Sequence, residues 1–175
     1  IVATDHASGD LIELHTNENE AFSGLVFKTI VDPFVGRISF IKVKSGVLSS
    51  DSVVYNSLKD ENEKISQIFI IKGKHQTAVG KLFTGDIGAV TKLAYTQTND
   101  TLCEKGKNIV LDGVEFTQPM LGVAVWPKSK NDDDKLSTAL ARMQEEDPTC
   151  RVVNNPETKE NVLYGVGDQH IDVLV

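Results

Sequence analysis

The stretch from Phe22 to Gly46 constrains the fold of this chain more than any other, because it predicts two β-strands joined by a tight turn. Leu25–Ile30 is an alternating apolar run, and Arg37–Lys44 continues as a second strand. The intervening Asp32–Gly36 segment, DPFVG, supplies turn residues. Pro presets φ, Asp can bond its own backbone and Gly tolerates a positive φ, so the sequence predicts a β-hairpin here.

The second of these strands has two different faces. Successive side chains of a strand point to opposite sides of the sheet, which places Ile38, Phe40, Lys42 and Lys44 on one face and Arg37, Ser39, Ile41 and Val43 on the other. Neither face is wholly apolar. The sequence therefore leaves open which one packs against the core.

From residue 21 to about residue 115, short strand-like runs alternate with turn signals and no convincing long helix interrupts them. The turn signals include Ser45-Gly46, Ser49-Ser50-Asp51, Lys59–Glu63, Gly85-Asp86 and Thr98-Asn99-Asp100. Strands at this spacing are typical of an antiparallel barrel or sandwich. We favour a β-barrel over residues 21–116, because closure removes exposed strand edges.

The pattern changes beyond Glu115 to strand, helix, strand, strand, helix. The predicted elements are a strand over Met120–Trp126, a helix that starts at Asn131–Asp134, strands Thr149–Asn154 and Asn161–Val166, and a helix from Gln169. Asn131–Asp134 should supply a capping side chain and acids to the start of the first helix. The first helix should end near Asp147, because Pro148 disfavours helical geometry in the residue before it. This order is that of a ferredoxin-like, split βαβ domain over residues 117–175 that lacks its last strand.

Residues 1–20 are polar and acidic, and we expect a linker remnant that is poorly ordered at its start. The chain begins at Ile1 rather than Met and ends inside an apolar pattern at Val175. It is therefore expected to be part of a longer protein. The sequence has no run of eighteen apolar residues, so we expect no membrane span. Its first residues lack a basic region followed by an apolar block, so we expect no signal peptide.

Charge is distributed unevenly along the chain, whose net charge is −7. Only residues 21–91 carry an excess of bases, with nine lysines and arginines against six acids. A turn at Lys72-Gly73-Lys74-His75 concentrates positive charge and could contact phosphates, and Arg37 belongs to the same basic block. The alternative is that these are ordinary solvated side chains of a barrel.

Catalytic and metal-binding patterns are missing from the sequence. It has no phosphate-binding loop of the G-x-x-x-x-G-K-[ST] type, and its four histidines follow no ligand spacing. We expect no metal site and no enzyme activity in this part of the protein. Cys103 and Cys150 also follow no metal spacing, so a reduced pair is favoured over a disulfide. His170 begins a predicted helix, where it either bonds locally or makes a functional contact.

Several motifs together resemble the elongation factor G family of bacterial translational GTPases. In the first domain they are DPFVGRISFIKVKSG, SVVYN and GDIGAV, and in the second they are VAVWPKSK, DDKLSTALARMQEEDPTCRV and GVGDQHIDVLV. The resemblance covers nearly all of the chain beyond residue 20. It implies the family's domain II, a translation-factor-type β-barrel, followed by most of its ferredoxin-like domain III.

The resemblance also implies a function: a ribosome-binding, GTPase-coupled module in tRNA–mRNA translocation in the cytoplasm. Its partners would be small-subunit ribosomal RNA, a ribosomal protein and the parent's own GTPase domain, which would hold GTP and Mg²⁺. Arg37, Lys72, Lys74 and His75 would face the RNA. His170 and Trp126 would make interdomain contacts, and no membrane or cofactor would be needed in this part of the chain.

Three positions depart from the family pattern. Trp126 stands where an acidic residue is usual before Pro-Lys, Cys150 replaces a usual phenylalanine, and Asp168-Gln169 only partly matches the usual lead-in to the last helix. These departures leave open a paralogue or a ribosomal protection protein. A stand-alone barrel module, or a barrel-containing enzyme such as a flavin reductase, is the alternative from another class; it would require a cofactor fingerprint and a complete second domain.

Overall fold

The chain divides into two units, Ile1–Val114 and Glu115–Val175. The computed structural model describes residues 1–175, except for the side chain of Lys130. Each unit has a hydrophobic core of its own, so each is described by itself.

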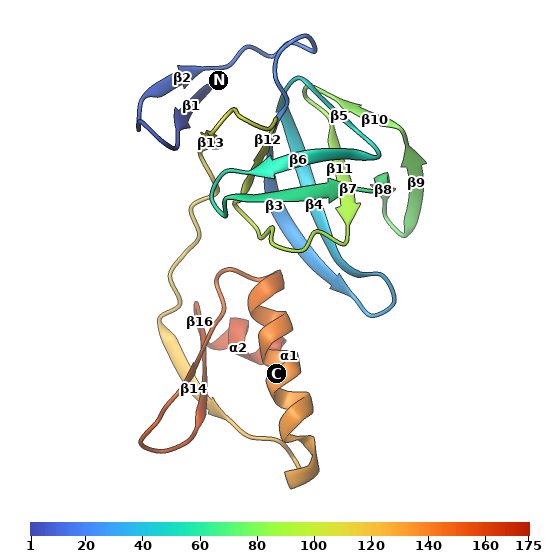
Figure 1. Cartoon of the computed structure of the whole chain (residues 1–175). Coiled ribbons are helices and arrows are strands. Elements are labelled where there is room, and N and C mark those ends of the chain that lie inside the picture. The colour runs from blue at the N-terminus through green and yellow to red at the C-terminus, as the bar shows by residue number, and fades with distance from the viewer. The chain divides into compact units, whose positions relative to one another are not determined.

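The first unit is built from β-strands (Figure 1). They are β1 (Val2–Asp5), β2 (Leu11–Glu13), β3 (Ser23–Asp32), β4 (Gly36–Ser45), β5 (Val47–Ser49), β6 (Ser52–Asn56), β7 (Glu61–Ile65), β8 (Ile68–Lys72), β9 (His75–Val79), β10 (Lys81–Phe83), β11 (Ile87–Thr91), β12 (Thr101–Cys103) and β13 (Ile109–Leu111).

Eight of these strands form one antiparallel sheet in the order β7-β6-β12-β3-β4-β11-β8-β9. Two smaller sheets accompany it, one of β10 and β5 and one in the order β13-β1-β2. The predicted antiparallel, barrel-type fold is confirmed. Among the described strands the pairing order is open, ending at β7 and β9, so hydrogen bonding between strands does not close the barrel.

The β3–β4 hairpin lies at the centre of the large sheet, as the turn residues predicted. Asp32 Oδ1 accepts hydrogen bonds from the backbone N–H groups of Phe34 and Val35, each at 2.8 Å. These two bonds lower the pKa of the Asp32 carboxyl. Gly36 completes the turn with a φ of 83°, a left-handed conformation that other residues adopt at a cost.

The structure also shows which face of β4 packs inward. Ser39, Ile41 and Val43 are fully buried, whereas on the other face Phe40 and Lys42 are only partly buried and Ile38 alone is buried. The core beneath them contains Phe22, Val26, Ile41, Val43, Leu48, Val54, Ile65, Ile68, Leu82, Val90, Leu93 and Leu102. The face that carries Ser39 is therefore the core face, despite its polar residues.

Residues 1–20 differ from the predicted linker, because they contain the paired strands β1 and β2. β1 pairs with β2 and with β13, so the start of the unit lies beside its end. Ala3 and Leu14 are buried there in a second small core with Ile109 and Leu111. Burying these apolar side chains outweighs the acidic character of the segment.

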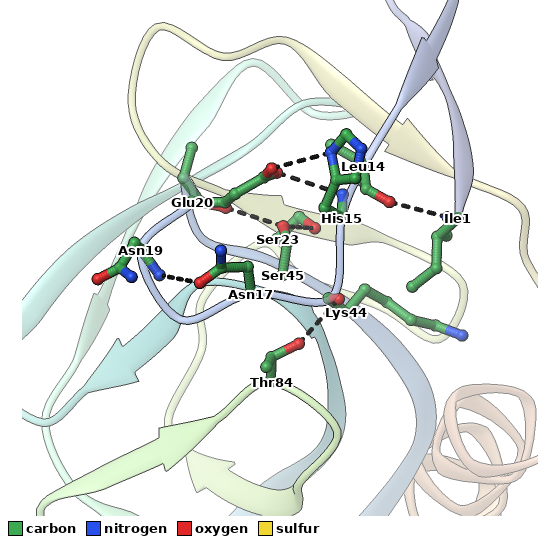
Figure 2. A network of polar contacts seen from close by, with 11 residues as sticks. Ile1, Leu14, His15, Asn17, Asn19, Glu20, Ser23, Lys44, Ser45 and Thr84 are labelled. Atoms are coloured by element: carbon green, nitrogen blue, oxygen red, sulfur yellow. Dashed lines mark hydrogen bonds and ion pairs between the residues drawn. The ribbon is translucent and has the colours of Figure 1, made fainter.

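A network of polar contacts holds the chain between Leu14 and Ser23 against β4 (Figure 2). His15 Nδ1 lies 3.0 Å from Glu20 Oε1, and the Asn17 side chain accepts a bond from the Asn19 backbone N–H. Ser45 Oγ donates to the Ala21 carbonyl at 2.8 Å and lies 2.7 Å from Ser23 Oγ. These contacts fix the path of the chain as it enters β3.

The second unit consists of β14 (Leu121–Val125), a 3₁₀ turn η1 (Lys130–Asp132), α1 (Asp133–Glu146), β15 (Arg151–Asn154), β16 (Asn161–Gly165) and α2 (Asp168–Leu174). Its strands pair in the order β14-β16-β15, and both pairs are antiparallel. The first and second strands are therefore parallel, with the third between them. This arrangement confirms the ferredoxin-like prediction.

The ends of α1 agree only in part with the prediction. Asp132 is the N-cap residue, but its carboxylate accepts bonds from Ser129 Oγ and Lys135 Nζ rather than capping the helix backbone. These bonds lower the pKa of Asp132, the one from Lys135 more than the one from Ser129. The helix ends at Glu146, two residues before Pro148, as the proline predicted.

Candidate functional site

Three of the four predicted RNA-facing residues lie together at the tip of the β8–β9 hairpin. Lys72 and His75 are the last cross-strand pair, and Gly73 and Lys74 form the two-residue connection between them. Gly73 has a φ of 59°, the left-handed conformation that two-residue hairpin loops require. All four residues are exposed, so the tip presents two lysines and a histidine to solvent.

Arg37, the fourth residue, lies beside the turn of a different hairpin, β3–β4. It pairs with Val31 at the start of β4, is half-buried, and Nη1 lies 3.5 Å from the Ala94 carbonyl. The Lys92 backbone N–H also bonds the Arg37 carbonyl, at 3.3 Å. Arg37 is therefore part of the packing between β4 and the loop that follows β11.

Strand register separates Arg37 from the β8–β9 tip. Phe40 of β4 pairs with Ala89 of β11, which in turn pairs with Phe69 of β8. Arg37 comes three residues before this row and Lys72 three residues after it. Because β4 and β8 both run antiparallel to β11, the two residues extend in opposite directions, up to about 20 Å apart along the strands. Arg37 belongs to one basic block with Lys72 in the sequence, but the strand register does not bring the two residues together.

An exposed aromatic residue near Arg37 was not among the sequence candidates. Phe34, at the tip of the β3–β4 hairpin, is 97% exposed. The signal was present in the DPFVG turn, because a residue between Pro and Gly at a hairpin tip has no core to enter. Tyr95, beyond β11 and half-exposed, is a second aromatic residue at this end of β4.

The loop that carries Tyr95 is held in place by a buried carboxylate. Glu63 of β7 is 3% exposed and accepts hydrogen bonds from the backbone N–H groups of Ala94, Tyr95 and Thr96 and from Thr96 Oγ1. The four distances are between 2.7 and 3.0 Å. A buried charge of this kind is tolerated only because its hydrogen bonds are satisfied. Glu63 therefore sets the shape of the loop.

His170 uses both ring nitrogens inside the second unit. Nδ1 accepts the backbone N–H of Val166 at 3.0 Å, and Nε2 lies 3.0 Å from Asp147 Oδ2. Because Nδ1 accepts, the ring proton resides on Nε2 and is donated to the carboxylate. The imidazole thus joins the end of α1 to the start of α2, which corresponds to the local bonding considered for this residue.

Asp147 is the C-cap residue of α1 and combines several contacts. Burial raises the pKa of its carboxyl, but hydrogen bonds from Thr149 and His170 outweigh that effect and the net pKa is lowered. Burial, and then the charge of Asp147, raise the pKa of the neighbouring Cys150 thiol. Cys103 and Cys150 are both free and buried.

The described part of the chain offers neither a metal site nor a membrane-spanning helix. No three His, Cys, Asp or Glu side chains there lie in an arrangement that could hold a metal ion. None of the helices described is long and apolar enough to cross a membrane. The sequence contains no phosphate-binding loop of the G-x-x-x-x-G-K-[ST] type.

Two family models match the chain in succession. Residues 21–105 match "Elongation factor G domain 2" and residues 116–175 match "Elongation Factor G, domain III". The chain belongs to the elongation factor G family. The two matched segments fall in the two units of the structure, in the order that the resemblance implied.

Individual relatives agree with this assignment. Elongation factor G from each of two strains of Ureaplasma parvum serovar 3 is 41% identical over 171 residues, which is 98% of this chain and 25% of the relative. A crystal structure of a protein from Thermus thermophilus matches 89% of this chain and 24% of its own, with a TM-score of 0.76 and 23% identity, and supports the fold. The chain spans about a quarter of the curated relatives it matches.

Proposed function

We propose that this chain is the ribosome-binding, GTPase-coupled part of a translation elongation factor that acts in tRNA–mRNA translocation. Residues 21–116 would be its domain II and residues 117–175 most of its domain III. The support is membership of the elongation factor G family over both units, together with the order of the matched segments.

The observation that carries this proposal within the structure is the β8–β9 tip. Lys72, Lys74 and His75 project from a two-residue connection with no acidic residue between them. A short hairpin loop loses little conformational entropy on binding, so its cations are well suited to phosphate contacts. We assign this tip to small-subunit ribosomal RNA, and Arg37 to a separate contact beside the turn of the β3–β4 hairpin.

The other partners are a ribosomal protein and the parent's own GTPase domain, in the cytoplasm. GTP and Mg²⁺ belong to that domain in this proposal. His170 would serve the interdomain contact indirectly, because its nitrogens already fix the start of α2 against the end of α1. Trp126 is 66% exposed and is available for a direct contact with a partner.

The test is co-sedimentation of the 175-residue chain with small ribosomal subunits across a salt series, using Lys72→Ala/Lys74→Ala. Removing one phosphate contact should reduce the slope of log affinity against log salt by about 0.7 to 0.9. The double variant is therefore expected to bind more weakly and with a slope smaller by about 1.4 to 1.8.

The matched control is Lys105→Ala/Lys107→Ala, which removes the same charge from exposed positions elsewhere in the first unit. It should leave both affinity and slope close to those of the unchanged chain. Equal weakening by the two pairs would show that net charge matters and not the tip. Binding that is unchanged by the Lys72/Lys74 pair would remove the site assignment.

A further inference from the structure

The sheet of the second unit has one face covered by helices and one that the described residues leave open. Leu163 and Val152 point to the covered face, where they pack with Leu140 of α1 and Ile171 of α2. Figure 1 shows both helices on the same side of β14 and β16. The side chains that alternate with Leu163 and Val152 therefore point away from the helices.

The open face is defined by these alternating positions. From the three strands it comprises Gly122, Ala124, Arg151, Val153, Val162 and Tyr164. Met120 and Trp126 continue the same alternation at the two ends of β14 and are 85% and 66% exposed. Ala124, Val153, Val162 and Tyr164 are partly buried, so the exposed large apolar side chains of this face are Met120 and Trp126. Exposed apolar side chains gathered on one sheet face indicate an interaction surface.

One cross-strand row of the open face has a specific shape. Gly122, Tyr164 and Arg151 are direct neighbours across β14, β16 and β15. A β-carbon placed on Gly122 would lie 2.7 Å from Tyr164 Cε1 and 3.1 Å from both Cδ1 and Cζ. The tyrosine ring thus lies against the glycine backbone, a position that only a residue without a side chain permits. Tyr164 is partly buried, so part of the ring remains accessible.

The only charge on the three strands β14, β15 and β16 is positive. Arg151 is exposed and is the one charged residue within β14, β15 and β16. Its guanidinium, on the strand next to Tyr164, is suited to bind a phosphate or to stack on a base. The strands place no carboxylate on this face that would repel a phosphate backbone.

From this arrangement we propose that the open face binds single-stranded RNA by base stacking. One base stacks on Tyr164 while Arg151 contacts its phosphate, and a second base stacks on Trp126. Trp126 is four residues along the chain from Gly122, about 13 Å, so the two rings hold different bases. This contact differs in kind and in place from the phosphate contact of the β8–β9 tip, and does not depend on it.

A protein surface is the other possible occupant, and it would make Trp126 the interdomain residue that the sequence suggested. The Gly122–Tyr164–Arg151 row favours RNA. An outward-facing aromatic ring beside a guanidinium matches a base joined to a phosphate, whereas an apolar protein surface would leave the arginine without a countercharge.

Trp126 makes the proposal directly testable, because it is the single tryptophan of the chain. A short unstructured RNA is titrated into the 175-residue chain while tryptophan fluorescence is recorded, with a duplex of the same length in parallel. The single strand should quench the fluorescence and the duplex should not. Tyr164→Leu, which keeps an apolar side chain on Gly122, should weaken binding about tenfold. Arg151→Gln should weaken it and reduce its salt dependence.

Control variants separate this proposal from the proposed function. Tyr95→Leu removes a half-exposed aromatic residue from the first unit and should leave the quenching curve unchanged. Lys72→Ala/Lys74→Ala should also leave it unchanged, even where that pair weakens ribosome binding. Circular dichroism establishes that Tyr164→Leu is folded, and Arg151→Gln alters only an exposed side chain.

Several outcomes would overturn the proposal. They are the absence of quenching by single-stranded RNA, equal quenching by the duplex, and quenching unaffected by both Tyr164→Leu and Arg151→Gln. Binding of a protein partner that these two variants abolish, with no response to RNA, would assign the open face to protein instead.

Discussion

Replacement of Glu63 should destabilise the first unit far more than its position on a short strand suggests. The carboxylate is buried and accepts bonds from the N–H groups of Ala94, Tyr95 and Thr96 and from the Thr96 hydroxyl. In Glu63→Gln one oxygen becomes an NH₂ group. The new NH₂ group then faces either the backbone N–H of Ala94 or the donors of Tyr95 and Thr96, so these groups lose their acceptor and meet another donor.

The magnitude follows from the hydrogen bonds that each variant removes. A hydrogen bond to a charged group contributes about 1.5 to 3 kcal/mol, and a buried donor left unpaired costs about 1 to 3 kcal/mol. Glu63→Gln should therefore lower the free energy of unfolding by about 2 to 4 kcal/mol. Glu63→Ala leaves all of the donors without their acceptor and should cost about 4 kcal/mol or more, a large share of the stability of an ordinary domain.

The assay is urea unfolding followed by far-ultraviolet circular dichroism, together with amide hydrogen exchange of Ala94, Tyr95 and Thr96. Both variants should accelerate exchange at these three amides. Glu61→Gln is the control: it makes the same chemical change at an exposed position on the same strand, and should shift stability by no more than about 0.5 kcal/mol. A Glu63→Gln protein as stable as this control would refute the claim that the carboxylate holds the loop.

Two further predictions concern backbone conformation and pH. Gly46→Ala should lower the free energy of unfolding of the first unit by about 1 to 3 kcal/mol, measured in urea. The reasons are that φ is 67° and that the new methyl group would lie 2.6 Å from the Glu20 carbonyl oxygen. Gly73→Ala is the control: it has a similar φ but open space around it, so it should cost less, and equal costs would contradict the steric argument. The pKa of Asp147 is lowered in the folded chain, so its contribution to stability is present above its ordinary value of 3.8 and is lost as the pH falls below it. Protection of the α2 amides from hydrogen exchange, relative to their intrinsic rates, should fall in that range. Asp147→Asn should remove this part of the pH dependence, and a variant with an unchanged pH profile would argue against it.

The elements that could be predicted from the sequence are those whose cause is local. The β3–β4 hairpin follows from Asp32-Pro33 and Gly36, and the end of α1 follows from Pro148. The ferredoxin-like order follows in the same way, because each of its elements has its own periodicity and boundary signals.

What the sequence could not supply depends on contacts between distant segments. β1 and β2 were missed because both strands are too short to show a period, and β1 gains its second partner, β13, only about a hundred residues later. Arg37 was grouped with Lys72 because the distribution of charge along the sequence does not reveal how the strands are paired or in which register. Glu63 looked like one acid in a charged hairpin tip, since its partners are backbone amides more than thirty residues away.

The pairing of β1 with β13 has a mechanical consequence. Ala3 lies opposite Leu111 and Asp5 opposite Ile109, so the chain enters β1 and leaves β13 at the same end of this ladder. A pulling force applied at Ile1 and Val114 would open the ladder one residue pair at a time, as in unzipping, instead of shearing all of its bonds together. The eight-stranded sheet would bear load only after β1 had peeled away. Under tension, β1 would therefore detach and extend before the rest of the unit deforms.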